Sequence, residues 1–517
     1  MRGFHSTMAL ASSLAIAGAL AVTAPGDIGR AQQPPARPNI VFLLADDLGY
    51  ADVGFTGGTE IKTPNVDALA STGTRLAQHY AQPVCTPTRA ALMTGRYPMR
   101  HGLQIGVVRP WSQFGLPLEE RTLPQALRDV GYRTALVGKW HLGHYDRRYL
   151  PTARGFDLQY GLYNGAIDYY THERDGGHDW HRNDRASYDE GYATHLLAKE
   201  AVRIIKESDG KQPLFLDVAF NAPHQPLQVP DSYMAPYAHL PGPRKTYAGM
   251  VAVMDEAIGQ IVAALDEKGM RDNTIIVFSS DNGGLLPGVL SSNGQFRDGK
   301  GSLYEGGVRV AAFAAWKGHI TAGATVNQPI HVVDWYPTLL KLAGAKVDQS
   351  LALDGRDVWP TITQGKPTPH DVIVHNATPE SGAIRVGDWK LVLNGSIVID
   401  EGGGGRNAGA RRAPATSVVG GVGPGGRTQG LSAESLGGRP QVESGRAVPG
   451  QNTVELFNIA DDPYEKVNLA ETFPDKVREL RATYDAIAAT AVPPKAEPFP
   501  TEFKAPKVYG EPEGDVK

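Results

Sequence analysis

The sequence predicts an α/β fold: a large, mostly parallel sheet flanked by helices, followed by a smaller C-terminal domain with a short antiparallel sheet. One observation is that short apolar runs, typical of strands buried on both faces, alternate with helical patterns. Another is that polar and charged residues follow each of these runs. The runs span residues 39–44, 134–137, 214–218 and 274–278, and the helical patterns include residues 122–130 and 247–268.

The organisation of the chain indicates two domains. Its 517 residues exceed the size at which one hydrophobic core usually stops growing, so we expect a larger domain over residues 38–366 and a smaller one over residues 367–510. Residues 401–450 are dense in glycine and cannot bury a core, which predicts a flexible insertion in the smaller domain. Antiparallel strands are expected at residues 372–375, 382–385, 389–393 and 455–458, and a final helix at residues 474–491.

The N-terminus is typical of an export signal. Arg2 provides a positive start, residues 8–24 are apolar and rich in alanine and leucine, and small residues suited to cleavage follow. We therefore expect residues 1–31 to be a signal peptide and the mature protein to be periplasmic or secreted. Serine and threonine dilute this stretch, and the sequence has no other long apolar run, so no membrane span is expected.

Charge and cysteine content narrow the possible functions. The formal net charge of −4 indicates no basic surface for nucleic acid, so an anionic substrate has to be held by local cations. Cys85 is the one cysteine of the chain, so an internal disulfide cannot form. A lone cysteine is usually a small buried apolar residue, and only its neighbours can indicate another role.

Polar side chains follow each predicted strand of the large sheet. Ligands of open α/β sheets bind beyond the carboxyl ends of the strands, so these side chains are expected to converge on one crevice. The aspartates and the asparagine among them are hard oxygen donors, which suit Ca²⁺ or Mg²⁺ better than zinc. They could equally cap the helices that follow the strands. The residues are Asp46 and Asp47, Lys139 and His141, His224, and Asp281 and Asn282.

The segment around Cys85 is the most specific motif of the chain. Residues 82–96 read Gln-Pro-Val-Cys-Thr-Pro-Thr-Arg-Ala-Ala-Leu-Met-Thr-Gly-Arg. Cys-x-Pro-x-Arg followed by Leu-x-Thr-Gly-Arg resembles the signature of the formylglycine-dependent (type I) sulfatase family. Thr88 stands where that family usually has serine. Other blocks that resemble the family lie in its order at residues 39–49, 138–143, 222–224, 280–284, 299–309 and 456–469.

Within that family the sequence is most similar to arylsulfatase B, or N-acetylgalactosamine-4-sulfatase-like, enzymes. The segments that carry this similarity are residues 101–104, 115–119, 138–143 and 165–173. The resemblance implies an alkaline-phosphatase-like fold. It also implies hydrolysis of sulfate monoesters, with aryl sulfates as assay substrates and a sulfated sugar as the natural one.

The resemblance further implies a modified nucleophile and a metal ion. A formylglycine-generating or equivalent maturing enzyme would oxidise Cys85 to formylglycine, whose hydrated form attacks sulfur. The covalent sulfate ester would then be cleared by collapse to the aldehyde. One Ca²⁺ would lower the pKa of the attacking oxygen. The implied metal ligands are Asp46, Asp47, Cys85 in its modified form, Asp281 and Asn282.

The remaining catalytic roles also come from the resemblance. Arg89 would hold the diol and offset the charge of the carboxylates. Lys139 and Lys300 would bind the sulfate oxygens. His141 would be the base for collapse of the intermediate, and His224, aided by Lys300, the acid for the departing alcohol.

Other interpretations stay open from the sequence. A phosphonate monoester or phosphodiester hydrolase would use the same nucleophile, a non-catalytic binder of sulfated glycans would keep only the fold, and a thiol enzyme would use Cys85 directly. Residues 160–192, rich in tyrosine, histidine and aspartate, are interpreted either as the lining of a substrate pocket or as a polar surface loop. For this reason four residues are not placed in the catalytic set: His144, Tyr169, His172 and His178.

Overall fold

The computed structural model describes most of the chain from Arg37 onward, and this part forms one compact unit. The signal peptide predicted at residues 1–31 and the glycine-rich insertion predicted at residues 401–450 lie outside the described residues. The described ranges are 37–347, 349–378, 381–396, 453–498, 500 and 502–511.

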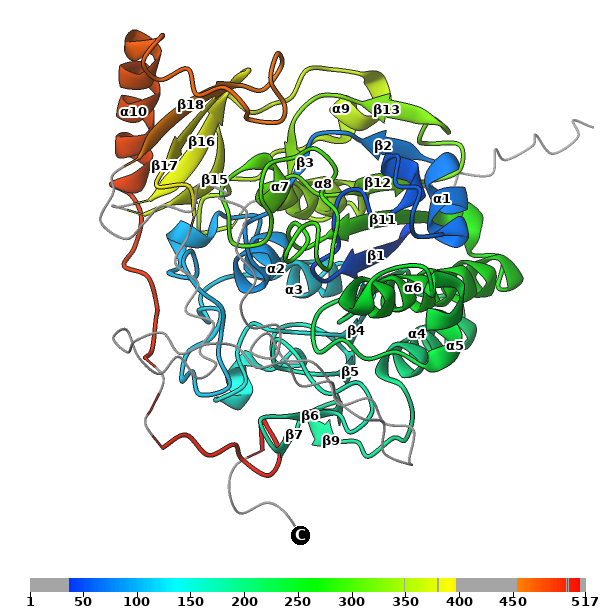
Figure 1. Ribbon diagram of the computed structural model, residues 1–517. Coiled ribbons are helices and arrows are strands. Elements are labelled where there is room, and N and C mark those ends of the chain that lie inside the picture. Colours follow the sequence, from blue (N-terminus) through cyan, green and yellow to red (C-terminus); the bar gives the residue numbers. More distant parts are fainter. Residues whose placement is uncertain are drawn as a thin grey trace, which may run out of the picture. The chain divides into compact units, whose positions relative to one another are not determined.

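A ten-stranded mixed sheet is the main element of this unit (Figure 1). Its five central strands run parallel and are, in spatial order, β11 (Thr274–Ser280), β1 (Asn39–Ala45), β10 (Leu214–Ala219), β4 (Arg133–Gly138) and β5 (Leu158–Gly161). Leu43 of β1 lies opposite Val218 of β10 on one side and Phe278 of β11 on the other. Four of these strands are the predicted ones, so the predicted α/β fold with a parallel centre is confirmed.

Both edges of the sheet contain antiparallel pairs, which the sequence analysis did not predict. Strands of two to four residues show too little alternation to be recognised in a sequence. Beyond β11 and β5, the added strands are β12 (Ala312–Ala315), β2 (Thr74–Leu76), β13 (Ala324–Val326), β8 (His181–Arg182) and β9 (Arg185–Ala186).

Two layers of helices cover the sheet, because its central strands are apolar on both faces. Phe42 of β1 belongs to one hydrophobic cluster and Leu43, the next residue, to the other, as the alternation of a strand requires. This double burial explains why the strand sequences are continuous apolar runs. The first cluster contains residues of α2 (Cys85–Thr94), α3 (Leu123–Arg128) and α8 (Trp335–Leu342), and the second contains residues of α1 (Pro64–Ser71), α4 (Ala193–Glu207) and α6 (Gly242–Glu267).

Helix α6 spans 26 residues and is apolar enough to cross a membrane by length and composition. However, 67% of its most apolar window is buried inside the fold, where it packs against α4 and α1. The Tyr247 hydroxyl of α6 accepts a hydrogen bond from the amide of Gly49, just after β1, at 3.1 Å. This helix is therefore a core helix that supports the end of β1, and not a membrane span.

A separate four-stranded antiparallel sheet is formed by the strands predicted in the C-terminal region. Leu391 in this sheet and Leu480 in the helix packed on it belong to the same hydrophobic cluster as Phe42 of the large sheet, so both sheets share a core. The division of the chain at residue 366 stays a prediction. The elements, in order, are β15 (Ile373–Ala377), β16 (Gly382–Val386), β17 (Trp389–Leu393), β18 (Val454–Asn458) and the helix α10 (Pro474–Ala488).

Between β5 and α4 the chain makes a long excursion over residues 162–192. It contains the short hairpin of β6 (Glu173–Arg174) and β7 (Gly177–His178), which lies beside the C-terminal segment drawn in red in Figure 1 and forms a β-bridge with it. Tyr169 and His172 are only 1% and 2% exposed. The interpretation of this region as a polar surface loop is therefore wrong for these residues.

Candidate active site

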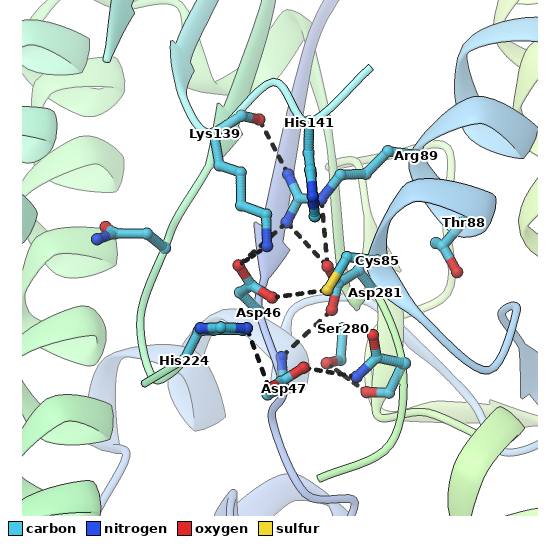
Figure 2. A network of polar contacts seen from close by, with 12 residues as sticks. Asp46, Asp47, Cys85, Thr88, Arg89, Lys139, His141, His224, Ser280 and Asp281 are labelled. Carbon is cyan, nitrogen blue, oxygen red and sulfur yellow. Dashed lines mark hydrogen bonds and ion pairs between the residues drawn. The ribbon is translucent and has the colours of Figure 1, made fainter. Parts of the chain in front are cut away.

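The polar residues predicted at the strand ends meet beyond the carboxyl ends of the central strands (Figure 2). Asp46 and Asp47 follow β1, Lys139 follows β4, His224 lies in the loop after β10, and Asp281 follows β11. Parallel neighbours end at the same edge of a sheet, so residues far apart in the sequence come together there. The structure therefore brings these strand-end residues together in one site, as expected.

Cys85 is the first residue of α2 and follows the extended residue Val84. Its side chain is 1% exposed, and its thiol donates a hydrogen bond to Oδ1 of Asp46 at 3.5 Å. Burial raises the pKa of the Cys85 thiol well above its ordinary value, and the nearby carboxylate of Asp281 raises it further. The side chain is therefore held as a neutral thiol in the centre of the site.

Arg89 lies one helical turn beyond Cys85, on the same face of α2. Its Nη2 and Nε donate to Oδ2 of Asp281 at 2.9 and 3.2 Å, and its Nη1 donates to the carbonyl oxygen of Lys139 at 2.9 Å. These bonds also hold the guanidinium 3.6 Å from the carboxylate of Asp46. The four-residue spacing of the Cys-x-Pro-x-Arg motif thus places both side chains in the same site.

Thr88, the departure from the usual motif, points away from the site (Figure 2). Its hydroxyl accepts a hydrogen bond from the amide of Gln82 at 2.9 Å and donates to the carbonyl oxygen of Gln82 at 3.2 Å. Thr88 is fully buried, so its methyl group is packed in the interior. The hydroxyl, which serine would also supply, closes the turn that leads into α2.

Three carboxylates are each paired with a cation around Cys85. Charges that are buried this deeply are stable only when such partners and hydrogen bonds compensate them. Burial alone would raise the pKa of Asp47, but Lys300 and then His224 lower it to about 2. The pairs are Lys139–Asp46 at 2.5 Å, Lys300–Asp47 at 2.9 Å and Arg89–Asp281 at 2.9 Å.

The same residues form a candidate metal centre. Ligand atoms of Asp46, Asp47, Cys85 and His224 all lie within 4.8 Å of one another. Beside this group, Asn282 donates its Nδ2 to Oδ1 of Asp47 at 2.8 Å, while its own Oδ1 is buried without a hydrogen-bond partner in the part of the chain that the structure describes. An unused oxygen donor is therefore available next to the carboxylates.

The charge of the centre also favours a cation. Burial, and then the like charge of Asp46, raise the pKa of Asp281 to about 6. An oxygen-rich set of this kind fits a hard divalent cation. The clustered ligand atoms differ from the predicted metal ligands in two respects. They include His224, and they do not include Asp281 and Asn282, which lie beside them.

His141 is held as a neutral imidazole with a free ring nitrogen. Its Nε2 donates to the carbonyl oxygen of Val108 at 3.0 Å, so the buried Nδ1, which has no hydrogen-bond partner among the described residues, keeps its lone pair. Burial, and then the charge of Lys139, lower the pKa of His141 well below its ordinary value. Gly165 permits the fold around this ring, because a Cβ at that position would lie 2.4 Å from Cε1 of His141.

His224 lies at the more exposed side of the site, with 17% of its side chain exposed against 2% for Asp47. Its Nδ1 donates to the carbonyl oxygen of Gln225 at 2.6 Å, which leaves Nε2 to accept a hydrogen bond from Nζ of Lys300 at 3.2 Å. Burial, and then the charge of Lys300, lower the pKa of His224 to about 3. The hydrogen bond between the two side chains therefore contains one proton, which is bound to Nζ of Lys300.

The loop that carries Lys300 is anchored by buried ions that the sequence analysis missed. Lys390 of β17 lies 2.8 Å from Glu305 and 2.9 Å from Glu465, and all three side chains are buried. The small sheet thus helps to place Lys300. The sequence contained one indication of this cluster, because Glu305 lies in the family-like block at residues 299–309. Its partner Lys390 comes from a distant strand, and no sequence pattern connects the two.

Asp217, in the middle of β10, was also missed. It is 2% exposed, its Oδ1 has no hydrogen-bond partner within the described ranges, and with Arg89 and Lys139 it lines a small cavity. Burial raises the pKa of Asp217 to about 7, although Arg89 opposes this. The sequence contained one indication of this residue, a single carboxylate within the apolar run at residues 214–218. Burying a carboxylate in such a strand is unfavourable unless the residue has a partner or a function.

Comparison with known proteins agrees with this geometry. The family model described as "Sulfatase" matches residues 38–345. Mouse arylsulfatase J is 37% identical over 479 residues, which cover 90% of this chain and 78% of that protein. Mouse N-acetylgalactosamine-6-sulfatase is 33% identical over 383 residues, which cover 69% of this chain and 72% of that protein.

A solved structure is similar over nearly the same extent. The crystal structure of Ps i-CgsB in complex with k-i-k-neocarrahexaose has a TM-score of 0.73 and 32% sequence identity, and the match covers 89% of this chain and 94% of that one. The fold is thus alkaline-phosphatase-like, as predicted. This chain belongs to the sulfatase family. It is a sulfuric ester hydrolase of the arylsulfatase type, and its assignment to the arylsulfatase B group stays a prediction.

Proposed function

We propose that this sulfatase hydrolyses sulfate monoesters through a hydrated formylglycine made from Cys85, and that its natural substrate is a sulfated sugar. The observation that carries the proposal is the position of Cys85, which lies at the first turn of α2 among three ion pairs and belongs to the candidate metal centre. A neutral thiol there is a poor nucleophile, because the reactive species of cysteine is the thiolate. The surrounding charges suit an oxygen nucleophile that attacks an anionic ester.

Maturation has to precede folding of this segment. Cys85 is 1% exposed and lies under the carboxylate of Asp46, so a formylglycine-generating or equivalent enzyme cannot reach it in the folded protein. Such an enzyme would act while α2 is still unpacked. We also propose that the protein is exported. A chain that carries the predicted signal peptide would still be unfolded when the maturing enzyme meets it.

A modified side chain and a metal ion would complete the site. The matured side chain at position 85 supplies a hydroxyl nucleophile for sulfur. A bound Ca²⁺ supplies positive charge that favours the ionised form of that hydroxyl. The donor set that would hold the metal ion consists of Asp46, Asp47, residue 85, Asp281 and Asn282.

The residues of the chain then have separate tasks. Arg89, fixed by its bonds to Asp281, orients the nucleophile and offsets the charge of the carboxylates. Lys139 and Lys300 provide cationic donors for the sulfate oxygens, which carry most of the charge in the transition state.

Proton transfer is assigned to His141 and to the Lys300–His224 pair. His141 presents an unprotonated Nδ1, which suits a base that takes a proton from the hydroxyl group at position 85. The departing alcohol receives its proton from the Lys300–His224 pair, in which Lys300 holds the proton and His224 accepts its hydrogen bond. Because His224 is at the exposed side of the site, this pair lies where a leaving group would depart.

Two alternatives are less well supported. A thiol enzyme would need an ionised Cys85, but burial and the nearby carboxylates disfavour that form. A non-catalytic binder of sulfated glycans would have no need for His141 with a free, buried Nδ1.

Parallel assays with p-nitrophenyl sulfate and p-nitrophenyl phenylphosphonate test the proposal. The protein is produced together with a formylglycine-generating enzyme, and the Cys85→Ala variant is the matched control. We expect turnover of the sulfate ester in the wild type and its loss in the variant. Faster turnover of the phosphonate would indicate a phosphonate monoester hydrolase instead, and equal sulfate turnover in Cys85→Ala would overturn the role of Cys85.

A further inference from the structure

A cavity of about 490 Å³ lies on the excursion over residues 162–192, and none of the predicted catalytic or metal-binding residues lines it. Its walls come from the β6–β7 hairpin, from residues 188–191 and from residues 507–508. The hairpin is fixed to the C-terminal segment, because the amide of His178 donates to the carbonyl oxygen of Lys507 at 2.9 Å. The cavity is therefore built by two segments that are far apart in the sequence and joined by backbone hydrogen bonds.

One wall of the cavity is an exposed aromatic platform. Tyr188 is 71% exposed and stacks on His178, with ring centroids 4.4 Å apart and an interplanar angle of 20°. His178 is itself held in place, because its Nε2 donates to the carbonyl oxygen of Ser187 at 2.9 Å. Tyr170, another lining residue, is 46% exposed. A rigid aromatic face that is left in solvent beside a cavity suits a ligand with a flat apolar face and polar edges.

The polar lining limits the chemistry of that ligand. Glu173, Asp189 and Glu190 line the cavity together with a single lysine, Lys507, so an anionic group such as a sulfate would be repelled. A divalent ion is also disfavoured. Within the described part of the chain, three or more ligand atoms of histidine, cysteine or carboxylates converge at the catalytic site and not here. Carboxylates that are spread around an aromatic platform instead suit the hydroxyl groups of an uncharged sugar, because they accept hydrogen bonds.

The cavity is connected to the catalytic site through Tyr169. Its hydroxyl donates to the carbonyl oxygens of Asn221 and His224, with distances of 2.5 and 2.9 Å. The next residue, Tyr170, already lines the cavity. The loop that carries His224, at the more exposed side of the catalytic site, is thus bonded to the segment that forms the cavity wall.

We propose that this cavity binds an unsulfated sugar unit of the same glycan chain whose sulfate ester is hydrolysed at the catalytic site. This inference rests on the proposed function and extends it, because it makes the substrate an oligosaccharide or polysaccharide with sugar units that lack sulfate. Tyr188 is the stacking residue of the cavity. Glu173 and Glu190 accept hydrogen bonds from the sugar hydroxyls.

Binding of sulfate-free hexasaccharides to the Tyr188→Ala and Tyr188→Phe variants tests the inference. The probes are neoagarohexaose, cellohexaose and mannohexaose, and binding is followed by saturation-transfer NMR. We expect at least one probe to bind the wild type with a millimolar dissociation constant and Tyr188→Ala to bind it about tenfold more weakly. Tyr188→Phe, which keeps the stacked ring, should bind within about twofold of the wild type.

A second measurement separates this inference from the proposed function. Turnover of p-nitrophenyl sulfate, which is too small to fill both sites, should be the same in Tyr188→Ala and in the wild type. The inference is overturned if none of the hexasaccharides binds, or if Tyr188→Ala binds them as tightly as the wild type. Failure of the wild type to hydrolyse p-nitrophenyl sulfate would instead count against the proposed function.

Discussion

Asp281 positions two other parts of the site, the Arg89 side chain and the backbone of Asp47. Its Oδ2 accepts hydrogen bonds from Nε and Nη2 of Arg89, and its Oδ1 accepts one from the amide of Asp47. One carboxylate thus orients a side chain of α2 and the backbone after β1. Its pKa of about 6, raised by burial and by Asp46, shows how much its charge depends on a neighbouring cation.

Asp281→Asn is expected to lower turnover of p-nitrophenyl sulfate by about a hundredfold or more, because the amide keeps the shape but loses the charge. The melting temperature of the wild type should be higher in calcium chloride than in EGTA, and this difference should shrink in the variant. Asp272→Asn is the control, since Asp272 is 70% exposed and pairs with Lys317 at the surface. Turnover near the wild-type level in Asp281→Asn would contradict the assignment of the metal centre.

Because of Asp217, the free energy of unfolding should depend on pH in a way that can be measured. Burial raises its pKa in the folded protein to about 7, so its contribution to stability is complete below its unfolded pKa of about 4 and is lost as the pH rises to 7. Asp217→Asn stays neutral at every pH. The free energy of unfolding of the variant, relative to the wild type, should therefore increase by roughly 2 kcal/mol between pH 5 and pH 8.

Urea denaturation at both pH values measures this difference. The Asp272→Asn variant serves again as the control, because a carboxylate that is 70% exposed should show almost no such change. An equal effect of Asp217→Asn at pH 5 and pH 8 would mean that Asp217 keeps its ordinary pKa in the folded protein.

At the scale of elements, the site depends on the contact between the small sheet and the loop of Lys300. Lys390 of β17 is buried between Glu465 and Glu305, the first residue of the short helix α7 (Glu305–Val308) that follows that loop. Burial raises the pKa of Glu465 to about 7, although Lys390 opposes this. Burying this carboxylate in its ionised form therefore costs free energy even when Lys390 is present. The small sheet therefore contributes to the site through charge as well as through the shared apolar core.

Lys390→Met is expected to lower the free energy of unfolding by about 3 to 5 kcal/mol, because it removes the ion pair of the buried Glu465 and leaves the buried Glu305 with Arg309, at 3.3 Å, in place of two cations. Lys341→Met is the matched control: Lys341 is 56% exposed and pairs with Asp357 at 3.0 Å, so its loss should change stability by less than about 1 kcal/mol. Urea denaturation at pH 7 measures both. Similar small losses in the two variants would contradict the role of Lys390.

The elements also show what a sequence pattern can predict. The four central strands were predicted because burial on both faces makes them continuous apolar runs, as Phe42 and Leu43 illustrate. The edge strands have two to four residues and carry no such pattern. The excursion over residues 162–192 was left between two interpretations, because its buried tyrosines and histidines are held by hydrogen bonds and stacking and not by a periodic apolar face.

For the whole molecule, the order of the strands explains why so much of the site could be predicted. Each polar residue singled out in the sequence directly follows a central strand or lies in a block of the family, and the parallel sheet brings these positions to one edge. What remained hidden depends on contacts between distant segments. Lys390 of the small sheet pairs with Glu305, Asp217 lines a small cavity together with Arg89, and Lys507 lines the cavity of Tyr188.

The central claim is that Cys85 works only after its conversion to formylglycine. The most direct test is the mass spectrum of the peptide that contains residue 85, taken from protein co-produced with a formylglycine-generating enzyme. The expected result is a peptide whose thiol has been replaced by an aldehyde, in a fraction that rises and falls with turnover of p-nitrophenyl sulfate. A fully active protein whose peptide retains the sulfur of Cys85 throughout would contradict the claim.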